Sequence, residues 1–552
     1  MRTRGEPLNQ ATGAAGIAVA FVAVTVAYPL LVLSLQALFP QALSGHFSDL
    51  GAGFRAMAKK PGLGPMLLLS LAWGAATTGG AWIIGVPAGW ALARFDFPGR
   101  RLARLSLLAP VMLPPFLLAL AYILVWQRGG LAEQMFGVVP AWMQEQFFGF
   151  AGVTGVMVLT SSGAVALAIE AAWRGLPARA GETAESLGAN LRQRWQHIFL
   201  PLLLPAVLNS GVLVFVDALS NFGVPTTLGT RAHLPLLPAE IYALVTSWPV
   251  NLPLATALSL LLCVVATALF QLTRTLLRTT QGQQSGGGGP TVKKLGPGGT
   301  IAAWVGFGTG FIVGGAAPLV VIVLASLVER WNDGAPIWTL DHYRRVLAPD
   351  GTGWAALLTS AGLGASVATI CAIVGGIGAY ANARHRGWLI RVNDQLTLLP
   401  RIVPSIAIVV AMILAWNAPW ILLPIYHTGW VLLLAYLALY QGDAARLADT
   451  GMRGIGGNLE QAAALLGASR GRIWRDVVLP ILRPALLAGW ALTFVGCVRD
   501  LVASVMLLPP GMHTVGSYIF AQFEQGELAQ AMAMAVCGLA LSGGVLLLLP
   551  RR

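Results

Sequence analysis

Long apolar segments alternate with short polar loops along the whole chain. Each apolar segment approaches or exceeds the length of about 20 residues that a helix needs to cross a bilayer, and backbone groups in lipid must be paired within the segment. The pattern predicts an all-α integral membrane protein with about twelve transmembrane helices. The expected spans are about 14–39, 64–93, 105–126, 151–173, 201–222, 251–277, 301–327, 355–382, 395–416, 419–440, 481–507 and 528–549.

The first six segments resemble the last six in sequence. GWALAR at 89–94 corresponds to AYANAR at 379–384, and Pro114 overlies Pro404. An even number of spans in each half makes these parallel repeats. We therefore expect two homologous six-helix halves related by a pseudo-twofold axis along the membrane normal, with the substrate path between them.

A polar stretch separates the halves. QGQQSGGGGPTVKKLGPGG at 281–299 has the glycine and charge content of a flexible linker. We expect a first permease-like half at 1–280, a cytoplasmic linker at 281–299 and a second half at 300–552.

The positive charge of the chain predicts its orientation in the bilayer. The formal net charge is +13, although only 10% of the residues are charged and 56% are apolar. Basic residues such as Arg94, Arg192 and Arg384 collect in alternate loops, so the positive-inside rule puts both termini in the cytoplasm. The same rule accounts for the charge without nucleic acid. The first apolar run exceeds the 7–15 residues of a signal-peptide core, so we expect an uncleaved span in a bacterial inner membrane.

No cluster of residues predicts catalysis or metal binding. Cys263, Cys371, Cys497 and Cys537 lie apart in separate apolar segments without C-x-x-C spacing, and the seven His are scattered. These cysteines read as small packing residues. We therefore expect no enzyme activity, no metal site and no cofactor bound by this chain.

One polar pattern occurs twice between apolar segments. It reads ETAESLGANLRQRWQHIFLP at 182–201 and QAAALLGASRGRIWRDVVLP at 461–480. In each copy a Gly precedes a Leu-Pro pair by the same interval, and a Trp follows the Gly. Gly allows a tight turn after a short helix, and a Pro is compatible with the first turn of the next one. We expect two rigid cytoplasmic protrusions, each with an apolar tip, formed in the first copy by Leu187 and Trp195.

This pattern resembles the EAA motif of the permease subunits of ABC importers. In the first copy Thr183 replaces the first Ala of the motif, and in the second Gln461 stands where Glu is expected, one place after Glu460. In that family the loop is a coupling helix that sits in a cleft of the ATPase subunit. The resemblance implies a MetI-like permease fold. It assigns ATPase docking to Glu182, Ala184, Glu185, Leu187, Gly188, Trp195, Pro201, Gln461, Ala462, Ala463, Leu466, Gly467, Trp474 and Pro480.

The resemblance also implies the partners. The chain has no G-x-x-x-x-G-K-[ST] run, so ATP-Mg would be bound and hydrolysed by other polypeptides. Two coupling loops imply two cytoplasmic ATPase subunits, and a periplasmic or lipid-anchored binding protein would deliver the substrate. The stretches SNFGVPTTLG at 220–229 and LPAEIY at 237–242 resemble ferric-iron importers. Thiamine, polyamine and phosphonate uptake are the alternatives.

Ionisable residues inside apolar segments are costly and are candidates for function. Asp217, Asn221, Arg499 and Asp500 lie near the ends of corresponding segments, and Asn221 overlies Asp500. Two interpretations remain open for them: they line the path or a gate, or they are structural groups at a helix interface.

A second group of charges precedes each repeated loop. Glu170 and Asp449 overlie each other, and Arg174 and Arg453 follow them at helical spacing. We expect structural ion pairs there.

Two other classes of membrane protein are alternatives to an ABC permease. DFPGRR at 96–101 loosely resembles a loop of major-facilitator secondary transporters, but that class does not explain the repeated pattern. An integral-membrane enzyme would need clustered His, Asp or Glu at membrane depth. Copurification of a soluble ATPase would separate these alternatives.

Overall fold

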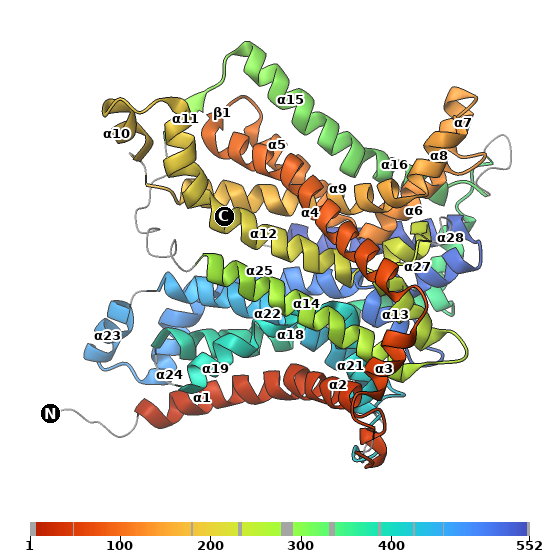
Figure 1. The fold of residues 1–552 in the computed structure, drawn as a ribbon. Helices are drawn as coiled ribbons and strands as arrows, with labels where there is room; N and C mark the ends of the chain where they lie inside the picture. The colour runs from red at the N-terminus through yellow and green to blue at the C-terminus, as the bar shows by residue number, and fades with distance from the viewer. Residues whose placement is uncertain are drawn as a thin grey trace. The chain divides into compact units, whose positions relative to one another are not determined.

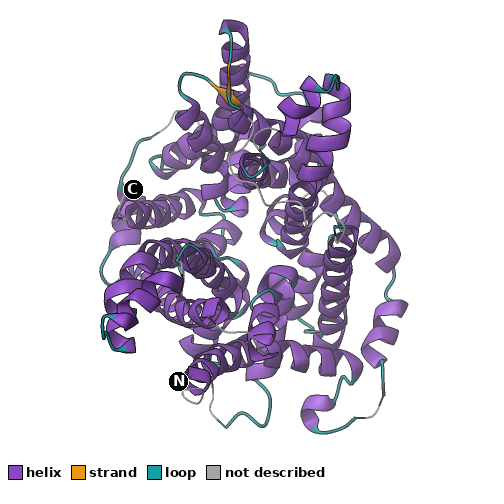
Figure 2. Ribbon diagram, turned by 90° about the vertical axis from the view of Figure 1, so that its left-hand side faces the viewer, coloured by secondary structure: helices purple, strands orange, loops and turns teal. Residues whose placement is uncertain are grey.

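The computed structural model describes residues 7–47, 49–177, 180–229, 234–277, 291–329, 337–384, 388–422, 425–455 and 457–548. Most of these residues are helical, and they contain a single short pair of strands (Figures 1 and 2). Ten helices in these ranges are long and apolar enough to cross a membrane, and one strongly bent pair would make an eleventh. The prediction of an all-α integral membrane protein is confirmed.

The chain forms two compact units. One comprises Lys60–Ala243 and Leu261–Ile337, and here it is called the first unit because it contains the first repeated loop. Its elements are α4 (Leu63–Arg94), β1 (Phe95–Asp96), α5 (Arg100–Met112), α6 (Pro115–Trp126), α7 (Leu131–Phe136), α8 (Ala141–Phe147), α9 (Phe150–Arg174), α10 (Ala180–Ser186), α11 (Leu191–Arg194), η3 (Trp195–Phe199), α12 (Leu200–Ser220), η4 (Pro225–Gly229), β2 (Lys293–Lys294), α15 (Pro297–Phe311), η5 (Ile312–Ala316) and α16 (Ala317–Ser326). Helices α4, α9 and α12 pack together as its centre.

The second unit comprises Met1–Lys59, Leu244–Leu260 and Trp338–Arg552. Its elements are α1 (Pro7–Val22), η1 (Ala23–Ala27), α2 (Tyr28–Leu38), η2 (Ala42–Ser44), α3 (Ala52–Lys59), α17 (Asp341–Leu347), α18 (Thr352–Arg384), α19 (Trp388–Leu396), α20 (Leu399–Ile402), α21 (Ser405–Trp416), α22 (Gly429–Arg453), α23 (Gly457–Leu465), α24 (Arg470–Ile473), η6 (Trp474–Val478), α25 (Leu479–Arg499), α26 (Val502–Met506), α27 (Val515–Glu524) and α28 (Leu528–Leu548). Helices α18, α22 and α25 form its centre. Two further helices, α13 (Leu237–Thr246) and α14 (Leu252–Leu276), have residues in both units.

Small residues bring the central helices close in both units. A Cβ at Gly85 of α4 would lie 2.6 Å from the Ser162 carbonyl oxygen of α9. A Cβ at the corresponding Gly375 of α18 would lie 3.0 Å from the Ala445 Cα of α22. Helices in membranes associate through such close packing, so the repeated glycine explains why the same pair of helices is central twice.

The opening helices are exchanged with respect to the sequence halves. Helices α1 and α2 begin the chain, but they pack on α18, α19 and α21 of the second half. Helices α15 and α16 follow the middle of the chain, and they pack on α5 and α6 of the first half. The compact units therefore do not coincide with the divisions at 1–280 and 300–552, which the sequence repeat defines.

Two expected continuous spans are broken at proline. The segment 105–126 forms α5 and α6, which are interrupted at Leu113 and Pro114, and the segment 395–416 bends by 108° before α21. Proline donates no backbone hydrogen bond and disfavours helical geometry in the preceding residue. The overlaid prolines Pro114 and Pro404 carry the same break in both halves.

One expected span was wrong in its bounds. The segment 419–440 was expected to cross the membrane, but the helix there is α22, Gly429–Arg453, whose start is capped by Thr428. Its C-terminal part carries charged residues, and it is not among the ten apolar candidates.

The end of the expected linker has regular structure. Residues 281–290 lie outside the described residues, but Lys293 and Lys294 pair in parallel with Phe95 and Asp96. Helix α15 then begins at Pro297, before the expected boundary at residue 300.

Candidate coupling loops

The first repeated loop is a helix, a glycine turn and a second helix. After α10, Gly188 donates to the Glu185 carbonyl (3.0 Å) and Ala189 donates to the Ala184 carbonyl (2.9 Å). This is the hydrogen-bond pattern of a Schellman motif, in which the residue after the helix has a positive φ. Gly188 has φ +87°, which a residue with a Cβ adopts at a cost.

The second loop repeats this turn. After α23, Gly467 donates to the Ala464 carbonyl (3.0 Å) and Ala468 donates to the Ala463 carbonyl (3.1 Å). Gly467 has φ +81°. No described atom outside the immediate chain neighbours lies within 4 Å of a Cβ built on either glycine. The repeated glycine thus serves the backbone geometry of both turns and leaves open space around both tips.

Exposed leucines surround both glycines. Leu187 is 83% exposed, and Leu465 and Leu466 are 89% and 88% exposed. Each protrusion lies at one end of the long helices of its own unit. In Figure 1 the labels α10 and α11 mark the first protrusion, and α23 and α24 mark the second. Large apolar side chains standing free at the tip of a rigid turn are typical of a contact that a partner buries.

The tryptophans do not belong to the tips, which corrects the expectation for Trp195. Trp195 is half-buried and packs on Trp90, Trp173 and Phe199, with ring centroids 5.6, 5.8 and 5.6 Å away. Trp474 lies 6.3 Å from the ring of Tyr380 and is also partly buried. An indole is a large apolar group whose burial stabilises packing. Each Trp therefore anchors its loop to the body of its unit.

The prolines stand in the first turns of α12 and α25, as expected. These first turns are not free helix ends, because a continuous helical segment runs from Leu191 to Ser220 and another from Gly471 to Arg499. In each case one π-helical turn, η3 or η6, directly precedes the Leu-Pro pair. A proline leaves the carbonyl four residues earlier without its helical donor, and a π turn re-pairs the backbone.

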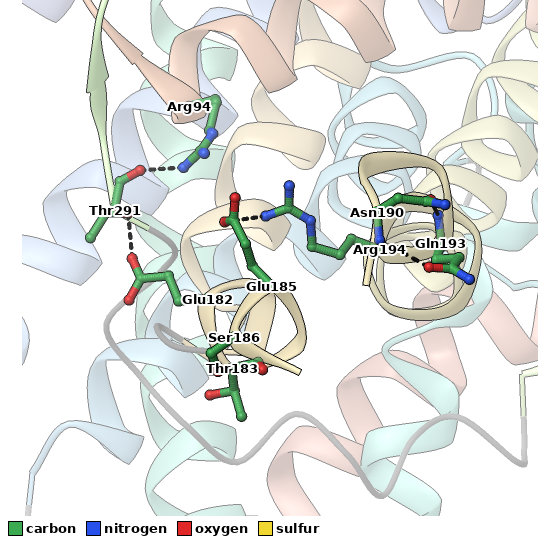
Figure 3. A network of polar contacts seen from close by, with 9 residues as sticks. All are labelled: Arg94, Glu182, Thr183, Glu185, Ser186, Asn190, Gln193, Arg194 and Thr291. Carbon is green, nitrogen blue, oxygen red and sulfur yellow. Dashed lines mark hydrogen bonds and ion pairs between the residues drawn. The ribbon is translucent and has the colours of Figure 1, made fainter. Parts of the chain in front are cut away.

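Polar contacts hold the first loop in place (Figure 3). Glu182 accepts a hydrogen bond from the Thr291 hydroxyl (2.7 Å), and the Thr291 carbonyl accepts one from Arg94 at the end of α4. Glu185 forms an ion pair with Arg194 across the turn.

The start of α11 is capped by its own side chains. Asn190 accepts from the Gln193 N–H (2.8 Å), and the Gln193 side chain accepts from the Asn190 N–H (2.9 Å), which completes a capping box. Together with the Glu185–Arg194 ion pair across the turn, this capping box holds the two helices of the first loop in a fixed arrangement.

The second loop uses a carboxylate that the motif does not specify. Glu460 pairs with Arg384 (2.6 Å), and both side chains are less than one-fifth exposed. Arg384 also donates to the Ile455 carbonyl (3.0 Å). Gln461, at the motif position, is exposed. Arg384 at the end of α18 corresponds to Arg94 at the end of α4. In the second loop it is therefore Glu460, and not Gln461, that contacts the end of the central helix. In the sequence, the only sign of this role is that Glu460 is adjacent to the motif position.

Asn221 and Asp500, which overlie each other in the repeat, directly follow the C-terminal ends of α12 and α25 and have the same capping role. Asn221 accepts from the Val224 N–H (3.0 Å). Asp500 accepts from the Ala503 and Ser504 N–H groups (2.9 and 3.2 Å) and from the Tyr440 hydroxyl (3.1 Å). Their side chains thus begin the chain reversal after each helix. Whether Asp217, Asn221, Arg499 and Asp500 line a path stays a prediction.

The expected ion pairs before the loops are confirmed. Glu170 is 2% exposed and binds both Arg174 (2.6 Å) and Arg104 (3.1 Å). Asp449 binds Arg453 (2.7 Å). The sequence analysis missed Arg104, which comes from α5 and ties that helix to α9.

The fold and the duplicated loops define the class of this protein. The chain belongs to the family of binding-protein-dependent transport system inner membrane components, whose model matches residues 85–280 and 372–550. It is therefore a multi-pass permease subunit of an ABC importer and not itself an enzyme. The predicted class is confirmed, and the major-facilitator and membrane-enzyme alternatives are set aside.

Individual relatives narrow the comparison. The chain is 26% identical over 438 residues to a ferric transport system permease of Actinobacillus pleuropneumoniae, which covers 77% of this chain and 62% of that protein. It is 22% identical to an Fe(3+)-transport system permease of Haemophilus influenzae, with 84% and 85% of the two chains covered. It is 32% identical to a putative 2-aminoethylphosphonate transport system permease of Salmonella typhi, over 44% of this chain and 90% of that protein.

Proposed function

We propose that this chain forms the substrate path of a ferric-iron importer and couples it to two cytoplasmic ATPase subunits. The observation that carries the coupling role is the duplicated Schellman turn with exposed leucines at its tip. Each turn is braced against its own unit by a half-buried Trp and by ionic contacts, so a force on the tip is transmitted to the long helices that follow.

The energetic demand on such a device is moderate. A gate that switches from 1:99 to 99:1 needs a bias of about 5.5 kcal/mol. Closure of two ATPase subunits on bound ATP-Mg supplies this bias through two loops. A binding protein outside the membrane delivers the substrate, and both termini and both loops lie in the cytoplasm.

Coverage of the relatives supports ferric iron as the substrate. The relatives named as ferric permeases align with more than two-thirds of this chain. An alignment of this length includes parts of both halves, as expected if these proteins also carry two permease halves in one polypeptide. The phosphonate permease is more similar in sequence, but its alignment covers less than half of this chain. Phosphonate uptake is therefore the second candidate.

The docking role is tested by copurification from the native membrane. The double variant Leu187→Asp/Leu466→Asp places charge at both tips. Val138→Asp is the matched control, because Val138 is 84% exposed in another part of the chain. We expect the wild type and the control to bring down the ATPase, and the double variant to bring down at least tenfold less. Equal recovery from all three would contradict the docking role.

The substrate is tested separately, in vesicles that contain the complete importer. Labelled ferric iron, 2-aminoethylphosphonate and thiamine are supplied one at a time, with ATP on the side of the membrane that carries the ATPase subunits. We expect ATP-dependent accumulation of iron. Accumulation of the phosphonate or thiamine without iron would refute the assignment of iron and leave the coupling role standing.

A further inference from the structure

A polar cavity lies within the second unit, near the end that carries α23 and α24. Its volume is about 570 Å³, and it is lined by α1, α18, α19 and α22. Clefts of roughly 300–1,000 Å³ are typical of small-molecule sites. The cavity lies beside the described loop but shares none of the loop residues, so nothing in the proposed transport function uses it.

Two buried amide side chains line this cavity, and each has an oxygen without a hydrogen-bond partner in the described residues. Gln441 is 3% exposed; its amide nitrogen donates to the Thr25 hydroxyl, which itself donates to the Phe21 carbonyl. This chain of donors fixes the orientation of the amide and leaves the Gln441 Oε1 without a partner in the described residues. Asn393 is 2% exposed and pairs on one side with Asn382, so its second polar atom, Oδ1, also lacks a described partner. A buried polar atom without a partner is destabilising, and a hydrogen-bond donor on a ligand would remove that penalty.

Opposite charges accompany the amides in the cavity wall. Asp449 is already paired with Arg453, which leaves one guanidinium, Arg446, and one carboxylate, Asp394. Within the described part of the chain, neither of these two side chains forms an ion pair within 4.0 Å. The charges of Asp394, Asp443 and Asp449 act on Arg446, but none of them is within ion-pair distance of it in the described residues. The cavity wall thus offers one guanidinium and one carboxylate outside close ion pairs, and two acceptor oxygens.

The corresponding space in the first unit is apolar. There a cavity of about 310 Å³ is lined by α4, α5, α9 and α15. At the positions of Asn382 and Asn393 stand Leu92 and Ala103, which are both fully buried and pack with Phe307. At this place the first unit therefore has an apolar cluster beside a smaller cavity, and within the described residues the buried amides and charged groups are found in the second unit.

We propose that the polar cavity binds a small zwitterion, a molecule with one anionic group and one ammonium group. The anionic group pairs with Arg446. The ammonium group pairs with Asp394 and donates to the amide oxygens of Gln441 and Asn393. A free cytosolic solute and the head group of phosphatidylethanolamine share this chemistry, and both can reach a cavity at the end of a membrane-embedded helix bundle.

The test measures binding to the purified full-length chain, which keeps it independent of the transport assay. Glycine and phosphoethanolamine are the free probes, and acetate and ethylammonium are controls that carry only one charge each. Calorimetry is performed in detergent. Native mass spectrometry on nanodiscs with and without phosphatidylethanolamine tests the lipid source. We expect a zwitterion to bind at least tenfold more tightly than either control.

Variants place the binding in this cavity. Arg446→Gln and Gln441→Leu should each weaken binding of the zwitterion at least tenfold. Arg391→Gln removes a charge from α19 outside the lining, and Ser162→Leu changes the position that corresponds to Gln441 in the first unit. Both controls should bind as the wild type does, and thermal melting verifies the fold of all four.

Each outcome decides the proposal. Binding of a free probe or retention of phosphatidylethanolamine, lost in the two cavity variants, supports it and identifies the source. Absence of binding for both sources at millimolar concentration overturns it. Binding that both cavity variants leave unchanged also overturns it.

Discussion

Substitution of Gly188 and Gly467 tests whether the two tips contact an ATPase. Both glycines have positive φ, and a Cβ on either would have no described atom within 4 Å outside its chain neighbours. A Cβ at either position therefore clashes with none of the described residues. Its internal cost is the backbone penalty of about 1–2 kcal/mol for an L-residue in the left-handed region. That penalty shifts the turn equilibrium roughly five- to thirtyfold.

Three substitutions separate the backbone penalty from the contact. Asn tolerates the left-handed region better than other residues, so Asn at both glycines should leave uptake close to the wild-type rate. Ala carries the full backbone penalty and should lower uptake by about fivefold if the turn limits coupling. Glu carries the same penalty and adds a bulky charge beside the exposed leucines. We expect it to lower uptake at least tenfold below the Ala variant.

The assay measures ATP-dependent uptake and ATP hydrolysis in vesicles that contain the complete importer. Thermal melting of each purified variant reports whether the membrane helices remain folded. We expect the Glu variants to melt as the Ala variants do, while uptake is lost and hydrolysis no longer responds to substrate. Normal uptake with Glu at both Gly188 and Gly467 would refute the coupling role of the loops.

Three further sets of substitutions test the contacts that hold the loops and the chain reversals. Trp195→Ala should destabilise the chain by about 2 kcal/mol, below the range for a fully buried Trp because the ring is half-exposed, and lower its melting temperature, whereas the exposed neighbour Gln196→Ala should not. A double-mutant cycle of Arg384→Ala and Glu460→Gln, followed by SDS titration, should give a coupling of about 1–2 kcal/mol, and additive effects would contradict the ion pair. Asp500→Asn should retain most of the free energy of unfolding, because Asn221 performs the same capping in the first half. Asp500→Ala should lower the free energy of unfolding by about 1–3 kcal/mol. Equal losses for both variants would refute the capping role.

Apolar periodicity and the duplicated motif were enough to predict the class of fold and the positions of both loops. The Gly-to-Pro spacing predicts a turn because only glycine fits its backbone geometry without cost, and Gly188 and Gly467 have the required positive φ. Charge spacing along a helix likewise predicted the Glu170–Arg174 pair. These inferences succeeded because they depend on local geometry alone.

Tertiary packing decided what the sequence analysis missed. The sequence pattern marks Trp195 as an apolar residue near a turn, but its partners Trp90 and Trp173 come from other helices. The motif gives Glu460 no role because a motif aligns residues by position, whereas an ion pair depends on which carboxylate reaches Arg384. The break at Pro404 was missed because apolar counts do not register the loss of a backbone donor.

The exchange of opening helices constrains how the protein is made. Helices α1 and α2 leave the ribosome first, but their packing partners α18, α19 and α21 belong to the second half of the polypeptide. The earliest hairpin must therefore wait in the bilayer, incompletely packed, while the intervening helices are inserted. A gene split between the two repeats would yield polypeptides that each carry the other's opening helix, so neither product would assemble without coexpression of its counterpart.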